Sequence, residues 1–212
     1  MLIVFQIIVL LFSAIIHEVS HGLAALRLGD KTAQIQGRLS LNPAKHLDPF
    51  GSVILPLLLA ISGLPVFGYA KPVPYNPYNL KNPKRGAALI AAAGPGSNFI
   101  LAIIFAVLIR AMAFFDLLMV GGGMVLVLFN IIVIINLILG FFNLIPIPPL
   151  DGSKILFYFF PARLGGGIQR FLNQYGFYIL IFLVFFANIP FLEPLVLGTH
   201  KLLVGQALAT LF

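Results

Sequence analysis

Three long apolar stretches, residues 2–26, 87–109 and 120–145, constrain the fold of this chain more than any other feature. A helix needs about 20 apolar residues to cross the hydrocarbon core of a bilayer, and each stretch reaches that length. Hydrophobic residues make up 60% of the chain and charged residues only 9%, which is too little polar surface for a water-soluble domain. We therefore expect a multi-pass integral membrane protein that contacts the lipid bilayer along most of its length.

Further apolar stretches raise the expected number of membrane segments to about four to six. Residues 171–189 are long enough to span, and the tail at 191–212 could either cross the bilayer or lie on it. Residues 48–70 are apolar but contain several prolines and glycines, which disfavour a straight helix. Basic residues flank this stretch on both sides, and the positive-inside rule places both flanks in the cytoplasm. We expect a re-entrant segment there, with an ordinary span as the alternative.

A short strand is expected between the first and second membrane segments. Apolar and polar residues alternate over residues 32–41, which is the period of a half-buried strand. The predicted fold class is therefore an all-α polytopic membrane protein with a small β element, in a single membrane-embedded domain over residues 1–212. The edge of such a strand could pair with an unwound substrate, whereas the alternative is a connector with accidental alternation.

The charged residues and the absence of cysteine narrow the possible functions. The net charge is +7, but lysine and arginine flank apolar segments and form no basic stripe with interleaved aromatics, so we expect no nucleic-acid partner. With no cysteine, disulfides and thiol chemistry are excluded. Any metal site must therefore use histidine, aspartate or glutamate.

The first apolar stretch contains the sequence His17-Glu18-Val19-Ser20-His21, an H-E-x-x-H motif. Residues four apart lie on one face of a helix, so His17 and His21 can bind one metal ion while Glu18 lies beside it as a base for a bound water. Chance placement rarely produces this pattern in a chain with four histidines and six acidic residues. Histidine and glutamate inside a lipid-spanning helix are also costly unless they have partners and a function.

A third ligand is needed, because catalytic zinc usually has three protein ligands and one open position. Asp151 is the remaining acidic candidate once those in loops and near the tail are set aside. It follows Asn143 in a segment with three prolines, which break the third long helix at membrane depth. Broken backbone at that depth is tolerated where it is buried in protein or lines a wet cavity. Charge bias also places His17 and Asp151 in the same, cytoplasmic half of the bilayer. The alternative role of Asp151 is a helix cap.

These motifs resemble the site-2 protease family of intramembrane zinc metalloproteases, whose hallmarks are H-E-x-x-H and N-x-x-P-x-P-x-x-D-G on two different spans. Both are present, at residues 17–21 and 143–152, and the resemblance extends over residues 15 to about 156, including Gly-Pro-Gly-Ser-Asn at 94–98. One departure is Ser153, where many members have a second glycine. From this length we expect no PDZ or other appended domain.

The resemblance implies residue roles that agree with those above. It implies that His17, His21 and Asp151 bind one zinc ion per chain and that Glu18 is the general base. It further implies that Asn143 orients substrate or stabilises an oxyanion, with a purely structural amide as the alternative. Asn98 could serve similarly.

The expected function is hydrolysis of peptide bonds in transmembrane protein substrates, by a protein of a prokaryotic cytoplasmic membrane with its active site toward the cytoplasm. A membrane ion or metal transporter is one alternative, because intramembrane His, Glu and Asp also mark ion pathways. A catalytically silent binding scaffold is another. The sequence does not indicate the oligomeric state.

Overall fold

The computed structural model describes residues 2–54, 57–58, 61–62, 71–115, 123–160, 162–185 and 191–205. Over these residues the chain forms seven α-helices and no strand. The helices are α1 (Leu2–Arg27), α2 (Thr32–Ile35), α4 (Pro83–Phe114), α5 (Gly123–Asn143), α6 (Asp151–Phe159), α7 (Ala162–Phe185) and α8 (Leu192–Val204). Shorter turns of 3-10 or π-helix are η1 (Pro43–Lys45), η2 (Pro49–Ile54) and η3 (Pro77–Asn79).

Four helices are long and apolar enough to cross a membrane: α1, α4, α5 and residues Gly166–Phe185 of α7. These correspond to the four spans predicted at 2–26, 87–109, 120–145 and 171–189. The helix α8 has 13 residues, fewer than the roughly 20 that a span needs. The molecule is thus an all-helical integral membrane protein with four candidate spans among the described residues.

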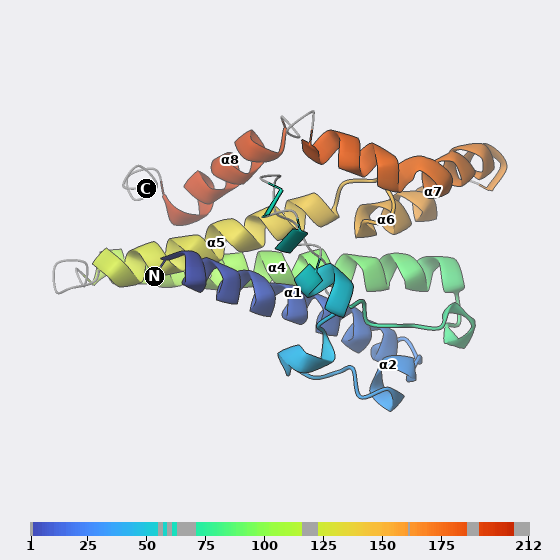
Figure 1. The fold of residues 1–212 in the computed structure, drawn as a ribbon, viewed down its shortest axis with the longest axis horizontal. Coiled ribbons are helices and arrows are strands. Elements are labelled where there is room, and N and C mark those ends of the chain that lie inside the picture. The colour runs from blue at the N-terminus through green and yellow to red at the C-terminus, as the bar shows by residue number, and fades with distance from the viewer. Residues whose placement is uncertain are drawn as a thin grey trace.

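Helix α4 lies at the centre of the bundle, where it packs against α1, α5, α6 and α8 (Figure 1). Its start is fixed locally, because the Asn82 side chain accepts a 3.0 Å hydrogen bond from the Arg85 N–H and Pro83 occupies the first helical turn. Helix α5 ends at Asn143, just before the prolines at 146, 148 and 149. The chain then turns and begins α6 at Asp151.

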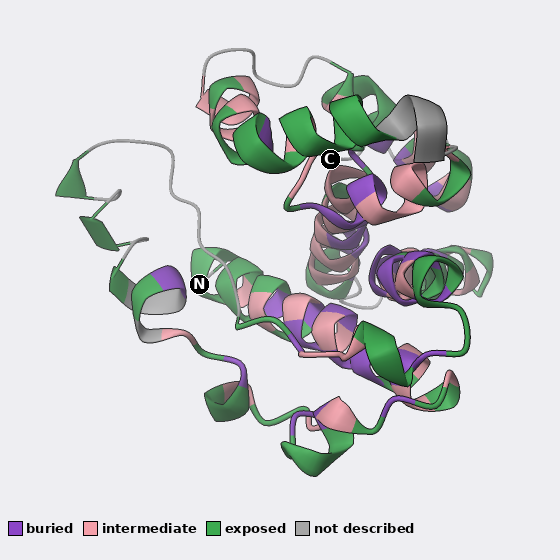
Figure 2. Cartoon of the chain, turned by 90° about the vertical axis from the view of Figure 1, so that its right-hand side faces the viewer, coloured by how far each residue is buried: buried purple, intermediate pink, exposed green. Residues whose placement is uncertain are grey.

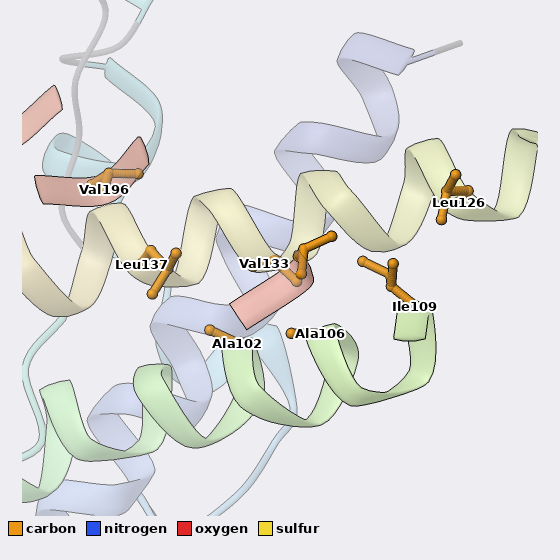
Figure 3. Close-up of a cluster of buried hydrophobic side chains, with 8 residues drawn as sticks. Ala102, Ala106, Ile109, Leu126, Val133, Leu137 and Val196 are labelled. Atoms are coloured by element: carbon orange, nitrogen blue, oxygen red, sulfur yellow. The ribbon is translucent and has the colours of Figure 1, made fainter. Parts of the chain in front are cut away.

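Small residues allow the central helices to approach closely. A buried cluster joins α4, α5 and α8 through Ala102, Ala106, Ile109, Leu126, Val133, Leu137, Val196 and Val204 (Figure 3). In lipid, helices associate through close packing rather than through the hydrophobic effect, and alanine at the interface brings the backbones together. Large apolar side chains such as Ile7, Ile100 and Val107 are about 60% exposed, as expected for a lipid-facing surface. Figure 2 shows this outer layer of exposed residues around a buried interior.

The strand predicted over residues 32–41 is wrong. Thr32–Ile35 forms the single helical turn α2, and Gly37 follows with a φ of +62°. Asp30 starts this turn, because its carboxylate accepts hydrogen bonds from the N–H and hydroxyl of Thr32. The apolar alternation does not match burial either, since Ile35 is 81% exposed and Arg38 is 8% exposed. Without a strand there is no strand edge here for a substrate to join.

Most of the stretch at 48–70, predicted to be re-entrant, lies outside the described residues. The described part begins with the π-helix η2. The end of the tail, from residue 206, also lies outside them.

Candidate metal centre

The side chains of His17 and His21 meet on one face of α1. Their Nε2 atoms are 3.0 Å apart and their rings are perpendicular, with centroids separated by 4.6 Å. This follows from the helical repeat, which brings residues four apart onto the same face. The helix buries both rings within the bundle, since the side chain of His17 is 8% exposed and that of His21 is 11% exposed.

Asp151 reaches the same point from a distant part of the sequence. Its Oδ2 lies 3.1 Å from Nε2 of His17 and 3.0 Å from Nε2 of His21. Asp151 is the first residue of α6, directly after the turn that follows α5. The next residue, Gly152, lies so close to this turn that a Cβ there would overlap the main-chain carbonyls of Leu144 and Ile145. The proline-rich break therefore places the carboxylate in the bundle interior.

The three groups fit a metal ion by their chemistry. Nδ1 of His21 lies 2.7 Å from the carbonyl oxygen of Ile90, which can only accept a hydrogen bond, so Nδ1 carries a hydrogen and Nε2 of the neutral ring has a free lone pair. In the neutral ring that lone pair faces Oδ2 of Asp151, another acceptor, and two buried acceptors 3.0 Å apart require a cation, either a proton or a metal ion, between them. A tetrahedral ion with bonds of about 2.0 Å holds its ligands roughly 3.3 Å apart, close to the spacing observed.

Helix α4 forms a wall of this centre at Gly94. A Cβ at Gly94 would overlap the rings of both His17 and His21. At Gly96, two residues further along the same helix, no heavy atom lies within 4 Å of the corresponding position. The absence of a side chain at Gly94 therefore lets this part of α4 lie directly against both imidazoles.

Glu18 lies beside the centre and is held by a main-chain donor. Its Oε2 accepts a 2.7 Å hydrogen bond from the N–H of Val73. Val73 belongs to the stretch 71–75, which Arg38 fastens in place by donating to the carbonyls of Lys71 and Pro72. Sequence reasoning missed Val73, because a main-chain N–H leaves no mark in the residue types.

A lysine adjoins the third predicted ligand. Nζ of Lys154 lies 3.2 Å from Oδ1 of Asp151, one helical turn away on α6. The three-residue spacing could have indicated this contact from the sequence. Oδ2 of Asp151 faces the histidines while Oδ1 is occupied by the lysine.

The two asparagines implied by the family resemblance behave differently. Asn98 contacts a predicted ligand, since its Oδ1 lies 2.7 Å from Nδ1 of His17. Asn143 instead donates through Nδ2 to the carbonyl of Leu139, one turn back in its own helix. A role for Asn143 toward substrate stays a prediction.

A polytopic helical protein with two imidazoles and a carboxylate buried between its spans, and a half-buried glutamate beside them, has the make-up of a membrane metallohydrolase. The family model described as "Peptidase family M50" matches residues 5–120 and 118–187. The chain belongs to this family, which confirms the resemblance to site-2 proteases. It is thus an intramembrane zinc metalloprotease.

Individual relatives of the chain support this assignment to a family of zinc metalloproteases. The chain is 39% identical over 189 residues to YwhC of Bacillus subtilis, covering 87% of this chain and 80% of that protein. It is 32% identical over 178 residues to Rip2 of Mycolicibacterium smegmatis, covering 82% of this chain and 64% of that protein. Both relatives are named as candidate zinc metalloproteases. The zinc metalloprotease MJ0392 of Methanocaldococcus jannaschii is 32% identical over 149 residues, which are 70% of this chain and 32% of that protein. No solved structure matches the chain.

Proposed function

We propose that the chain cleaves peptide bonds within transmembrane segments of other membrane proteins, with His17, His21 and Asp151 as zinc ligands and Glu18 as general base. The observation that carries the proposal is the convergence of Asp151 Oδ2 on the two Nε2 atoms, at 3.0 and 3.1 Å, inside a candidate span. His17 lies ten residues, about 15 Å along the helix, from the end of α1. A substrate bond that reaches this depth must itself lie in the membrane.

The proton transfers of hydrolysis fall to Glu18. Zinc, when bound, supplies a Lewis acid that polarises a carbonyl and acidifies water. Glu18 takes a proton from the attacking water as the water oxygen bonds to the scissile carbonyl carbon. It then delivers this proton to the amine nitrogen as the C–N bond breaks, which restores the carboxylate. Because Oε2 accepts from Val73, we assign the proton transfer to Oε1, the other oxygen of Glu18.

The substrate must lose helical structure before it can be cut. In a transmembrane helix each carbonyl is hydrogen-bonded to the N–H four residues ahead, which blocks approach to its carbon. Local unwinding costs less near residues of low helix propensity. We expect substrates with glycine, proline or asparagine near the cleaved bond to be preferred.

The site is proposed to open toward the cytoplasm of a prokaryotic cell. Arg27 ends α1, and Lys84 and Arg85 begin α4, so the ends of both helices nearest the centre carry basic residues. The positive-inside rule places such ends in the cytoplasm. Water would enter from that side.

The decisive experiment compares purified wild type with Glu18→Gln in vesicles that contain a single-span substrate. Wild type should release two fragments, and Glu18→Gln should retain zinc but cleave at least about 100-fold more slowly, as expected on loss of a general base. A chelator should stop wild-type cleavage, and added zinc should restore it.

Equal cleavage by wild type and Glu18→Gln would exclude the proposed base. Release of zinc across the vesicle membrane without cleavage would instead support the transporter alternative. Binding of substrate by wild type without any cleavage would support the silent scaffold.

A further inference from the structure

A line of buried polar side chains extends from His17 away from the metal centre. Nδ1 of His17 lies 2.7 Å from Oδ1 of Asn98, and Nδ2 of Asn98 donates to Oδ1 of Asn136 at 3.0 Å. Nδ2 of Asn136 in turn donates to the hydroxyl of Ser13 at 3.0 Å. These residues come from α1, α4 and α5, and both asparagines are fully buried. Burying an amide side chain at this depth in a membrane protein costs free energy, so a continuous series of hydrogen-bonded amides calls for an explanation.

One main-chain carbonyl fixes the donor-to-acceptor direction of these side-chain hydrogen bonds. Nδ2 of Asn136 also donates to the carbonyl oxygen of Ile132, at 2.9 Å. A carbonyl can only accept, so the amide of Asn136 must turn its NH2 group to Ile132 and its oxygen to Asn98. Asn98 must then present its own NH2 group to Asn136 and its oxygen to His17. Flipping either amide would set two acceptors, or two donors, against each other.

The direction of the amides determines which nitrogen of His17 carries hydrogen. Because Oδ1 of Asn98 accepts, Nδ1 of His17 must donate, and the lone pair of a neutral ring is then on Nε2. Nε2 is the atom that faces Asp151 and His21. The carbonyl of Ile90 imposes the same tautomer on His21 directly.

We propose that Asn98 and Asn136 are positioning residues that select the tautomer and orientation of His17 for zinc, with the carbonyl of Ile132 setting their direction. This inference rests on the proposed role of His17 as a ligand. If the amides were free to flip, a share of His17 would carry hydrogen on Nε2 and could not bind the ion. Partners that orient ligating histidines typically change metal affinity by about 10- to 100-fold.

Helix α5 also provides a matched control. Asn130 is 2% exposed, donates through Nδ2 to the carbonyl of Leu126 four residues back, and contacts Nε2 of His200 at 2.7 Å through Oδ1. It thus has the same burial and the same kind of main-chain bond as Asn136, but it contacts a different histidine. Asn130→Leu should cost stability as Asn136→Leu does, without changing zinc affinity.

The test measures the zinc dissociation constant of purified full-length protein by competition with a chelator. Asn136→Leu should weaken zinc binding by about 10- to 100-fold, because Asn98 can then flip. Ser13→Ala should change it less than about threefold, because Ile132 still directs Asn136. Asn98→Leu should weaken zinc binding as Asn136→Leu does. Asn98→Asp should weaken it less, because a carboxylate accepts from His17 in either orientation, although its other oxygen then opposes Oδ1 of Asn136.

The double variant Asn98→Asp with Asn136→Leu separates positioning from structural support. A carboxylate at position 98 needs no direction from residue 136, so the double variant should bind zinc nearly as tightly as wild type. A structural role for Asn136 predicts no such rescue. The inference is overturned if Asn136→Leu binds zinc like Asn130→Leu, or if the double variant binds no better than Asn136→Leu. If Asn136→Leu does not fold, the zinc affinities of Asn98→Leu and Asn98→Asp are compared instead. Equal affinities of these two variants overturn the inference.

These measurements remain informative if the proposed function fails. Wild type that binds zinc without cleaving any substrate would exclude proteolysis, but the affinities of the asparagine variants would still test the positioning. Full zinc affinity in His17→Ala would exclude the ligand role itself.

Discussion

The main-chain N–H of Val73 donates a 2.7 Å hydrogen bond to the carboxylate of Glu18, although the two residues are 55 positions apart. Val73 lies in the sequence Lys71-Pro72-Val73-Pro74. The prolines on both sides of it have no main-chain N–H to donate, whereas Val73 has one. The hydrogen bond therefore depends on the register of this stretch, which Arg38 holds by donating to two of its carbonyls. The proposed base and the buried arginine are thus coupled through a short stretch of backbone.

Removal of this donor should slow cleavage without loss of zinc. Val73→Pro eliminates the N–H while keeping an apolar side chain of similar size, and we expect the cleavage rate to fall by about tenfold or more, since a hydrogen bond to a charged group contributes about 1.5–3 kcal/mol. Val73→Ala is the control, because it removes the side chain and keeps the donor. Equal rates for the two variants would show that the hydrogen bond does not matter for catalysis.

A methyl group at Gly94 should abolish metal binding. Gly94→Ala places a Cβ against the rings of His17 and His21, so the rings must move and zinc should be lost together with activity. Gly96→Ala adds the same methyl to the same helix in open space and should bind zinc like wild type. Zinc content after gel filtration checks both. Full zinc content in Gly94→Ala would mean that the rings can shift without losing the ion.

The three proposed ligands should each be needed for zinc. Wild type should contain about one zinc per chain, and His17→Ala, His21→Ala and Asp151→Ala should each lower this content strongly. Lys154→Gln, which alters only the neighbour of Asp151, should retain it. Metal analysis of the purified proteins gives the answer, and full zinc content together with full activity in Asp151→Ala would show that the third ligand lies elsewhere.

Asp30 should make the stability of the fold depend on pH. Burial acts to raise the pKa of Asp30, but hydrogen bonds from Thr32, Asn79 and Asn76 outweigh it and hold the pKa below its ordinary value. A lowered folded pKa means that the carboxylate stabilises the fold above its unfolded pKa of about 3.9, and that this stabilisation is lost as the pH falls through the folded value.

Thermal unfolding of Asp30→Asn checks this. At neutral pH the variant should unfold about 4–8 °C below wild type, for a loss of about 2 kcal/mol. The difference should shrink as the pH falls below about 4. Glu193→Gln, which changes an exposed carboxylate on α8, should follow wild type throughout. A difference for Asp30→Asn that does not vary with pH would contradict the assignment.

The two basic segments on either side of residues 48–70 should face the cytoplasm. The chain has no cysteine, so single cysteines at Gln36 and Lys81 can be labelled from either side of intact cells or oriented vesicles. Both should react only from the cytoplasmic side, and a cysteine at Asp116, outside the described residues, only from the opposite side. Labelling of Gln36 and Lys81 from opposite sides would mean that the intervening stretch crosses the membrane fully.

The sequence predicted those features that depend on residue spacing within one helix or on prolines that end a helix. The spacing of His17 and His21 defines a shared face without any tertiary information, and the prolines after Asn143 predict the end of α5. The strand at 32–41 was predicted wrongly, because the alternation of apolar and polar residues carries no information about the side chain of Asp30. This side chain accepts hydrogen bonds from Thr32, where a helical turn begins. The partners of Glu18 and Asn98 could not be predicted, since they depend on the register between distant segments.

The contact between His17 and Asp151 joins residues 134 positions apart, which has a consequence for biosynthesis. A ribosome makes the chain from its N-terminus, so α1 enters the membrane with two imidazoles and a glutamate long before the carboxylate exists. A nascent chain that has not yet reached Asp151 lacks the proposed third ligand. The enzyme should therefore remain inert while most of its spans insert.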